Sequence, residues 1–172
     1  MKNTMKYLMV LALGLITLGS AHAQKAPKIG HINSNDLLTL MPEREEAAQQ
    51  LEAYAKQLET ELSTMTAEWE TKVEEFRSDT ASPDFVLQSK RERIQDLQAR
   101  IQKFQEDAQQ RLAEKEQELL EPIIKKAKDA IKAAADENGY TYVFDSSVGV
   151  LIHFPESDDL MPLVKKKLNI VN

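Results

Sequence analysis

Few side chains in this sequence have the type and spacing that catalysis or metal binding requires. There is no cysteine, so thiol catalysis, cysteine-based zinc sites and disulfides are excluded. The sequence contains no Gly-rich phosphate loop, no G-x-S-x-G elbow and no H-E-x-x-H motif. After the N-terminal leader only His31 and His153 remain. Both fall in expected strands without a nearby pattern of acidic ligands, so we expect packed or solvent-facing histidines and no metal site.

Carboxylates are plentiful, and hydrolysis by acid/base catalysis needs only two of them. It also needs a dry cleft that separates their pKa values. Here the carboxylates fall on expected helix faces with basic neighbours. The sequence therefore predicts neither an enzyme nor a cofactor.

The long middle of the chain has the apolar spacing of a helical hairpin. From Pro42 to 77 there is no glycine and no further proline, and apolar residues recur every three or four positions. The polar stretch 78–83 predicts a turn or flexible tip. A second helical stretch runs from 84 to about 138, and we expect Pro122 to interrupt it. The segment 42–121 is then an arm of two antiparallel helices with Pro42 and Pro122 at its base.

The apolar stripe is also the one candidate binding surface in the sequence. Its simplest role is to form the seam between the two helices. A two-helix hairpin, however, has no third layer to cover wide side chains, and aromatic and Met side chains make adaptable contacts. We take the following residues as candidates for contact with a client protein: Tyr54, Met65, Trp69, Val73, Phe76, Phe85 and Phe104.

The two ends of the chain predict a small β-containing body. Residues 28–33 form a strand candidate, and Ser34 could cap a short helix after it. Residues 140–145 and 148–154 alternate apolar and polar side chains, which predicts a β-hairpin that turns at 146–147. A helix from about Asp158 to Leu168 closes the chain. The fold class is α+β, mostly α.

A body of this size buries too little surface to be stable alone. Pairing its strand edges with other copies would cover those edges and the apolar strand faces. We therefore expect an oligomer, in which the contacts come from Ile29, Ile32, Tyr142, Phe144, Val150 and Ile152.

The N-terminus predicts export. Lys2 and Lys6 precede an apolar run of about 11 residues, which is too short to span a bilayer, and small residues follow at 19–23. We expect residues 1–23 to be a signal peptide that is cleaved after Ala23. The mature chain then has 20 basic and 28 acidic residues, and this net charge of −8 argues against nucleic-acid binding. No later segment predicts stable membrane insertion.

The order of these segments resembles the Skp/OmpH family of periplasmic chaperones. The most specific matches are Lys28-Ile29-Gly30-His31-Ile32-Asn33-Ser34 with Leu40-Met41-Pro42-Glu43, and Tyr140-Thr141-Tyr142-Val143-Phe144-Asp145 with Val150-Leu151. The resemblance implies a homotrimer whose body comprises 24–41 and 122–172 and whose three hairpin arms enclose unfolded outer-membrane proteins without using ATP. Well-known members are strongly basic, whereas this chain has a pI of about 5.2. Its acidic arms favour neutral or basic client segments.

Two functions remain open at this stage. The first is an ATP-independent periplasmic holdase, which would bind many unrelated unfolded chains through dispersed contacts. The alternative is a structural or adaptor coiled-coil protein that docks one folded envelope partner through a defined hot spot. Replacement of Trp69 by Ala should weaken binding modestly in the first case and abolish it in the second.

Overall fold

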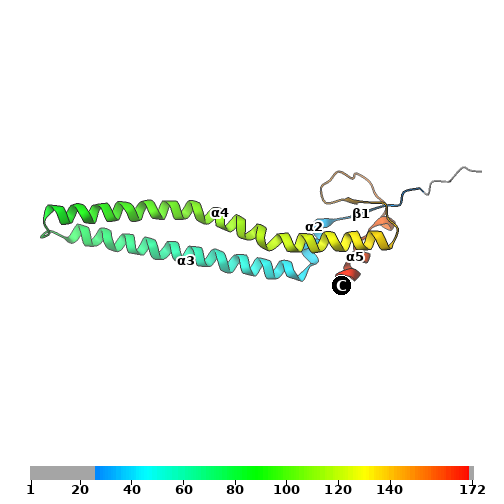
Figure 1. Cartoon of the computed structure of the whole chain (residues 1–172), viewed down its shortest axis with the longest axis horizontal. Coiled ribbons are helices and arrows are strands. Elements are labelled where there is room, and N and C mark those ends of the chain that lie inside the picture. The colour runs from blue at the N-terminus through cyan, green and yellow to red at the C-terminus, as the bar shows by residue number, and fades with distance from the viewer. Residues whose placement is uncertain (1–25, 171–172) are drawn as a thin grey trace, which may run out of the picture.

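Two long antiparallel helices form a rod with a small body at one end (Figure 1). The computed structural model describes residues 26–170, so the expected signal peptide and its cleavage point lie outside the described residues. Helix α3 (Pro42–Ser78) begins with Pro42 at its first turn, where a missing N–H costs nothing, and Glu43 and Glu45 lie at the positive end of its dipole. Helix α4 (Asp84–Glu137) returns along α3 and continues into the body. The predicted hairpin is therefore confirmed.

Pro122 does not interrupt the second helix, contrary to the sequence prediction. Helix α4 passes through it as one element of 54 residues. Proline removes a single intrahelical hydrogen bond and favours a kink, but burial of Ile123 and Ala127 directly after it holds the helix in place. In Figure 1, α4 bends where it runs past the beginning of α3.

The sheet of the body joins the two ends of the chain. Strand β1 (Ile29–Ile32) pairs in parallel with β2 (Tyr142–Asp145), with Ile29 opposite Tyr142 and Ile32 opposite Asp145. A parallel pair needs a long crossover connection. Here the whole hairpin serves as that connection.

The predicted β-hairpin at 140–154 is wrong in its second half. Residues 148–154 form no strand, although their side chains alternate as a strand requires. Within the described part of the chain, β2 pairs with β1. The isolated bridge from His31 goes to Asp159, which comes after residues 148–154. Alternation alone cannot form a strand without a neighbour to bond to.

The core of the body packs the short elements against the last turns of α4. Among the largest fully buried side chains, Ile32 comes from β1, Leu37 from α2 (Ser34–Leu40) and Val164 from α5 (Met161–Lys167). The other two are Met41, between α2 and α3, and Leu160, directly before α5. They contact the buried alanines of α4. Gly30 is required here, because a Cβ at this position would come within 2.3 Å of the Leu160 side chain. A 3-10 turn, η1 (Glu156–Asp158), precedes α5.

The cap of α2 is Asn33, not Ser34 as the sequence suggested. The Asn33 side chain accepts hydrogen bonds from the backbone amides of Asn35 and Asp36, each at 3.1 Å. The Ser34 hydroxyl instead donates to Asp145 at the end of β2, at 2.5 Å. Ser34 therefore ties the helix to the sheet.

Candidate functional site

The seam between the arms buries few side chains completely. Beyond Ala47 at the base, Leu58 and Leu97 are the buried residues of the seam, and its remaining apolar positions are half-buried. Six of the seven predicted client contacts are among these half-buried residues: Tyr54, Met65, Trp69, Val73, Phe76 and Phe104. Each contributes to the seam and still leaves part of its surface to solvent, so both roles considered from the sequence are open to it.

Phe85, the seventh candidate, lies outside the seam. It is in the first turn of α4, and 74% of its surface is exposed. Exposure of one large aromatic side chain at the end of the rod has no structural purpose within the single chain. Phe85 is therefore the candidate most readily available to another molecule.

Trp69 is oriented with its polar atom inward. Its indole Nε1 is buried and has no hydrogen-bond partner among the described residues. An unpaired buried N–H is unfavourable. Because the N–H of Trp69 is buried and does not reach solvent, the ring contributes to the packing of the seam more than its residue type alone suggested.

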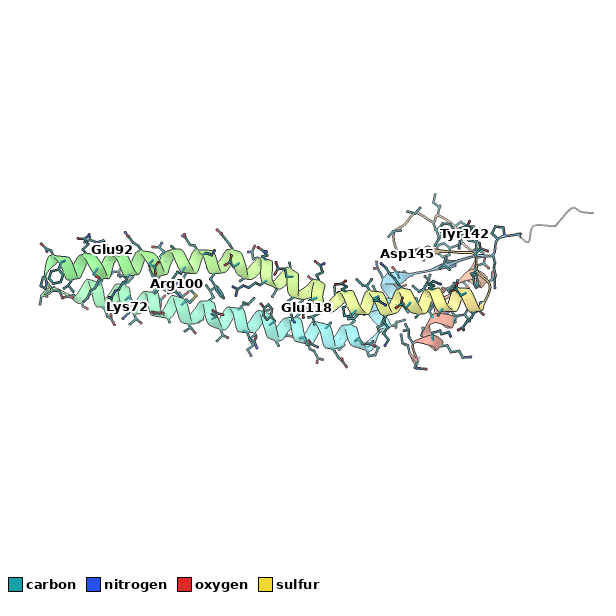
Figure 2. The ribbon with its side chains drawn as sticks, in the orientation of Figure 1. Lys72, Glu92, Arg100, Glu118, Tyr142 and Asp145 are labelled. Atoms are coloured by element: carbon teal, nitrogen blue, oxygen red, sulfur yellow. The ribbon has the colours of Figure 1, made fainter. Side chains whose placement is uncertain are left out.

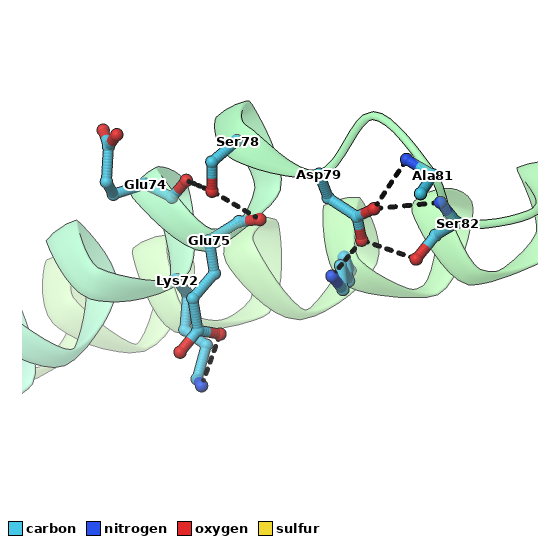
Figure 3. A network of polar contacts seen from close by, with 8 residues as sticks. Lys72, Glu74, Glu75, Ser78, Asp79, Ala81 and Ser82 are labelled. Carbon is cyan, nitrogen blue, oxygen red and sulfur yellow. Dashed lines mark hydrogen bonds and ion pairs between the residues drawn. The ribbon is translucent and has the colours of Figure 1, made fainter.

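The tip of the hairpin is held by a network centred on Asp79. Its carboxylate accepts hydrogen bonds from the amides of Ala81 and Ser82 at 3.3 and 2.9 Å and from the Ser82 hydroxyl at 2.6 Å, as Figure 3 shows. Lys90, in the second turn of α4, forms an ion pair with the same carboxylate. The contacts of Lys90 and Ser82 hold the pKa of Asp79 well below its usual value. The predicted turn is thus ordered by specific hydrogen bonds.

A cross-helix ion pair joins the beginning of α3 to α4 just beyond Pro122. Lys126 donates to the Glu43 carboxylate, and this hydrogen bond lowers the pKa of Glu43. Next to this pair the helices leave a half-open pocket of about 100 Å³, whose lining includes Ala47, Leu51 and Leu119.

The body exposes much of its apolar surface. Ile152 is 98% and Val150 77% exposed, and Ile29, Tyr142 and Phe144 are exposed as well. Ile32, which was predicted with them, is buried in the chain's own core. Val148 and Phe154, which belong to the same alternating sequence pattern, are exposed as well. Exposed apolar patches of this kind mark interaction surfaces.

Charged side chains line both helices along the rod, among them Lys72, Glu92, Arg100 and Glu118 (Figure 2). The charge is uneven along the arm. The halves next to the body, 43–60 and 104–121, hold 11 acidic and 4 basic residues, whereas the outer half, 61–103, holds 9 acidic and 7 basic ones. Most of the arm's negative charge therefore lies near the body.

Neither a metal cluster nor a membrane span is present in the described residues. Within 26–170 no three His, Cys, Asp or Glu side chains are grouped so that they could bind a metal ion. None of the helices in the same range combines the length and the apolar character needed to cross a bilayer.

Comparisons with known proteins agree with this architecture. The family model described as "Outer membrane protein (OmpH-like)" matches residues 28–168. The chaperone protein Skp of Yersinia pseudotuberculosis is 39% identical over 143 residues, which cover 83% of this chain and 87% of that protein. Skp of Vibrio cholerae is 31% identical and covers 86% and 88%.

A solved structure gives the same fold at low sequence identity. The OmpH-like protein of Caulobacter crescentus superposes with a TM-score of 0.71 at 14% identity and covers 87% of this chain and 88% of its own. At this identity the likeness concerns the fold alone. Together with the family match across both the body and the arms, it shows that this chain belongs to the Skp/OmpH family.

Proposed function

We propose that the chain is an ATP-independent holdase chaperone of the periplasm. It binds unfolded outer-membrane proteins between its helical arms and prevents their aggregation. Its relatives in Yersinia and Vibrio are named chaperones. The observation that carries the proposal is the incompletely covered apolar stripe of the arms, together with the exposed Phe85 near the tip.

Many weak apolar contacts suit a protein that must hold a client and then release it. Each half-buried side chain offers a small area, and burial of apolar surface contributes about 25 cal/mol per Å². The summed free energy of these contacts can outcompete aggregation of the client. A client that folds buries its own apolar residues and is then released without an energy source. The absence of a phosphate-binding loop in the sequence is in keeping with this cycle.

The proposed active form is a homotrimer that encloses the client between three arms. The exposed side chains of the body, with Ile152 and Val150 the most prominent, supply an apolar surface that a second copy could cover. Copies associated through the body would set their arms around a common space. In this cycle a folded protein does not bind, whereas the adaptor alternative requires a folded partner.

The test is the native mass of the mature chain, measured by size-exclusion chromatography with light scattering. The measurement is made with and without a urea-unfolded outer-membrane barrel protein that is added by rapid dilution. We expect a three-chain mass that gains one client and keeps it soluble. An oligomer that lets the client aggregate would contradict the holdase function, and a single-chain mass would contradict the trimer.

Two variants separate client contact from seam packing. Phe85→Ala removes an exposed ring and should weaken client binding severalfold without changing the thermal unfolding temperature. Trp69→Ala should lower that temperature and weaken binding only modestly. Complete loss of binding in a folded Trp69→Ala protein would instead indicate a single hot spot and favour the adaptor. Gln88→Ala, an exposed change on the same helix turn as Phe85, is the control.

A further inference from the structure

Among the described residues, His31 is the one buried ionisable side chain in the core of the body, and it contacts the segment that leads into η1. It lies in β1, and only 6% of its surface is exposed. Its Nε2 is 3.1 Å from the carbonyl oxygen of Pro155. Its ring lies against Phe154, with 4.1 Å between the ring centroids. His31 thus fixes two consecutive residues that are more than 120 positions away in the sequence.

The contact with Pro155 determines where the proton of the neutral ring lies. A carbonyl oxygen only accepts hydrogen bonds, so Nε2 must carry the hydrogen and donate it. The other nitrogen, Nδ1, then has a lone pair. Nδ1 is buried and has no hydrogen-bond partner among the described residues. A second proton on the ring would have to sit at this nitrogen, where it would find neither water nor an acceptor.

The charged groups on the surrounding elements already have other partners. On β2, Asp145 accepts from Ser34 and Ser147. In the segment after Pro155, the carboxylate of Asp159 accepts from the amide of Met161 at 2.8 Å, and Asp158 is within 3.5 Å of the Ser157 hydroxyl. Glu156 is exposed on η1, and Lys28, at the start of β1, donates to the carbonyl of Asn138. None of them is hydrogen-bonded to Nδ1.

We propose that His31 is an acid-sensitive latch that holds the segment 148–155 on the body. In neutral form its ring binds Phe154 and Pro155. Protonation makes the buried position unfavourable, and the ring reaches water only if these two residues move away. The open state therefore takes up one proton that the closed state does not.

Opening of the latch matters because of what the held segment carries. Val148, Val150 and Ile152 are the most exposed apolar side chains of the body, and they precede Phe154 directly. Acid would release this surface from its fixed position. The inference concerns the fold of the body, so it stands independently of the proposed chaperone function.

Hydrogen exchange of the backbone amides after Pro155 tests the proposal. Asp158 donates to Pro155, Asp159 to Glu156, and Leu160 to His31. The protection factors of these amides, corrected for intrinsic exchange, are measured by NMR between pH 8 and pH 5. We expect the protection to fall as the pH is lowered through this range, because the open state takes up a proton.

Two variants provide the matched comparison. His153→Gln removes the other histidine of the described chain, which is exposed, and should leave the pH dependence unchanged. His31→Gln keeps a donor for the Pro155 carbonyl but cannot be charged, so its protection factors should not change with pH. Protection factors that do not change with pH in the unmodified protein would overturn the proposal. Protection that rises in acid, as a new ion pair with Asp159 would cause, or loss of the pH dependence in His153→Gln, would overturn it too.

Discussion

Two aspartates hold the chain at opposite ends of the molecule. Asp79 closes the tip through the amides of its own turn and the ion pair with Lys90. Asp145 joins β2 to the beginning of α2 through Ser34 and also accepts from the amide of Ser147. Both are acceptor-only side chains that satisfy several donors, which a neutral replacement cannot do equally well.

Asp145 should make the stability of the body depend on pH in the acid range. Burial alone would raise the pKa of this carboxyl, but the hydrogen bonds from Ser34 and Ser147 lower it from 3.8 to about 2. A lowered pKa means that the stabilisation is complete above pH 3.8 and is lost as the pH falls through 2. Asp145→Asn should lower the free energy of unfolding at pH 7 by about 1 to 2 kcal/mol.

The measurement is urea unfolding at pH 7 and at pH 2.5. The difference between the unmodified protein and Asp145→Asn should shrink at the lower pH. Asp96→Asn, a change at an exposed carboxylate of the arm, should show no such difference at either pH. A constant difference across the whole range would mean that the Asp145 contacts do not depend on its charge.

Asp79→Ala should loosen the tip without unfolding the arms. The variant removes the acceptor of the Ala81 and Ser82 amides, so these amides should exchange with solvent faster. The thermal unfolding temperature should change little, because the seam is untouched. Thr80→Ala, in the same turn, serves as the control. If exchange in Asp79→Ala were as slow as in the control, the network would not be what orders the tip.

Local sequence signals predicted that a cap and a turn occur at these positions, but not which residues bond to each other there. A capping residue before α2 was expected, but Asn33 and Ser34 both suit that position, and only the position of Asp145 decides that Ser34 bonds elsewhere. Similarly, the polar stretch 78–83 predicted a turn. Local hydrogen bonds from Ala81 and Ser82 to Asp79 supply part of its order. The ion pair with Lys90 supplies the rest, and no local pattern connects Asp79 to a residue eleven positions away on α4.

At the scale of elements, the helical hairpin was predictable, whereas the strand expected at 148–154 does not form. Helix periodicity over dozens of residues is a strong local signal, and the seam satisfies it within one chain. The alternation in 148–154 is just as regular, but a strand exists only when a neighbour supplies hydrogen bonds. In the single chain that neighbour is lacking, and β2 bonds to β1, which begins more than one hundred residues earlier.

Pro122→Ala should stabilise α4. Proline inside a helix lacks the N–H that would bond to the carbonyl of Glu118, and it is about 3 kcal/mol less favourable than alanine there. We expect the free energy of unfolding to rise by up to this amount, measured by urea denaturation. Pro42→Ala is the matched control, because Pro42 occupies the first turn of α3, where no such bond is lost.

A fall in stability on Pro122→Ala would have a specific meaning. Pro122 lies beside the ion pair between Glu43 and Lys126 and lines a pocket with Ala47 and Leu119, and α4 bends where it runs past the beginning of α3 (Figure 1). A straight helix that lost these contacts would be destabilised in spite of its better backbone. The bend would then be required for the junction of arm and body.

For the whole molecule, the net charge of the arm is distributed unevenly along the long axis. The acidic excess lies in the arm halves next to the body, whereas Trp69, Phe76 and Phe85 lie in the outer half, where the charges nearly balance. An extended client could thus contact aromatic side chains far from the body and acidic ones close to it. Negative charge near the body also opposes non-specific association of loaded complexes.

Ile152→Lys tests whether the apolar face of the body is where copies meet. Ile152 is 98% exposed in the single chain, so the change should not affect the chain's own core or its helix content by circular dichroism. In an oligomer that buries this residue, each copy would instead place an unpaired ammonium in an apolar contact, which is strongly unfavourable. We expect the native mass by light scattering to fall to that of one chain. Ile152→Val, which keeps the contact apolar, should retain the mass of the unmodified protein, and an unchanged mass in Ile152→Lys would place the contact between copies elsewhere.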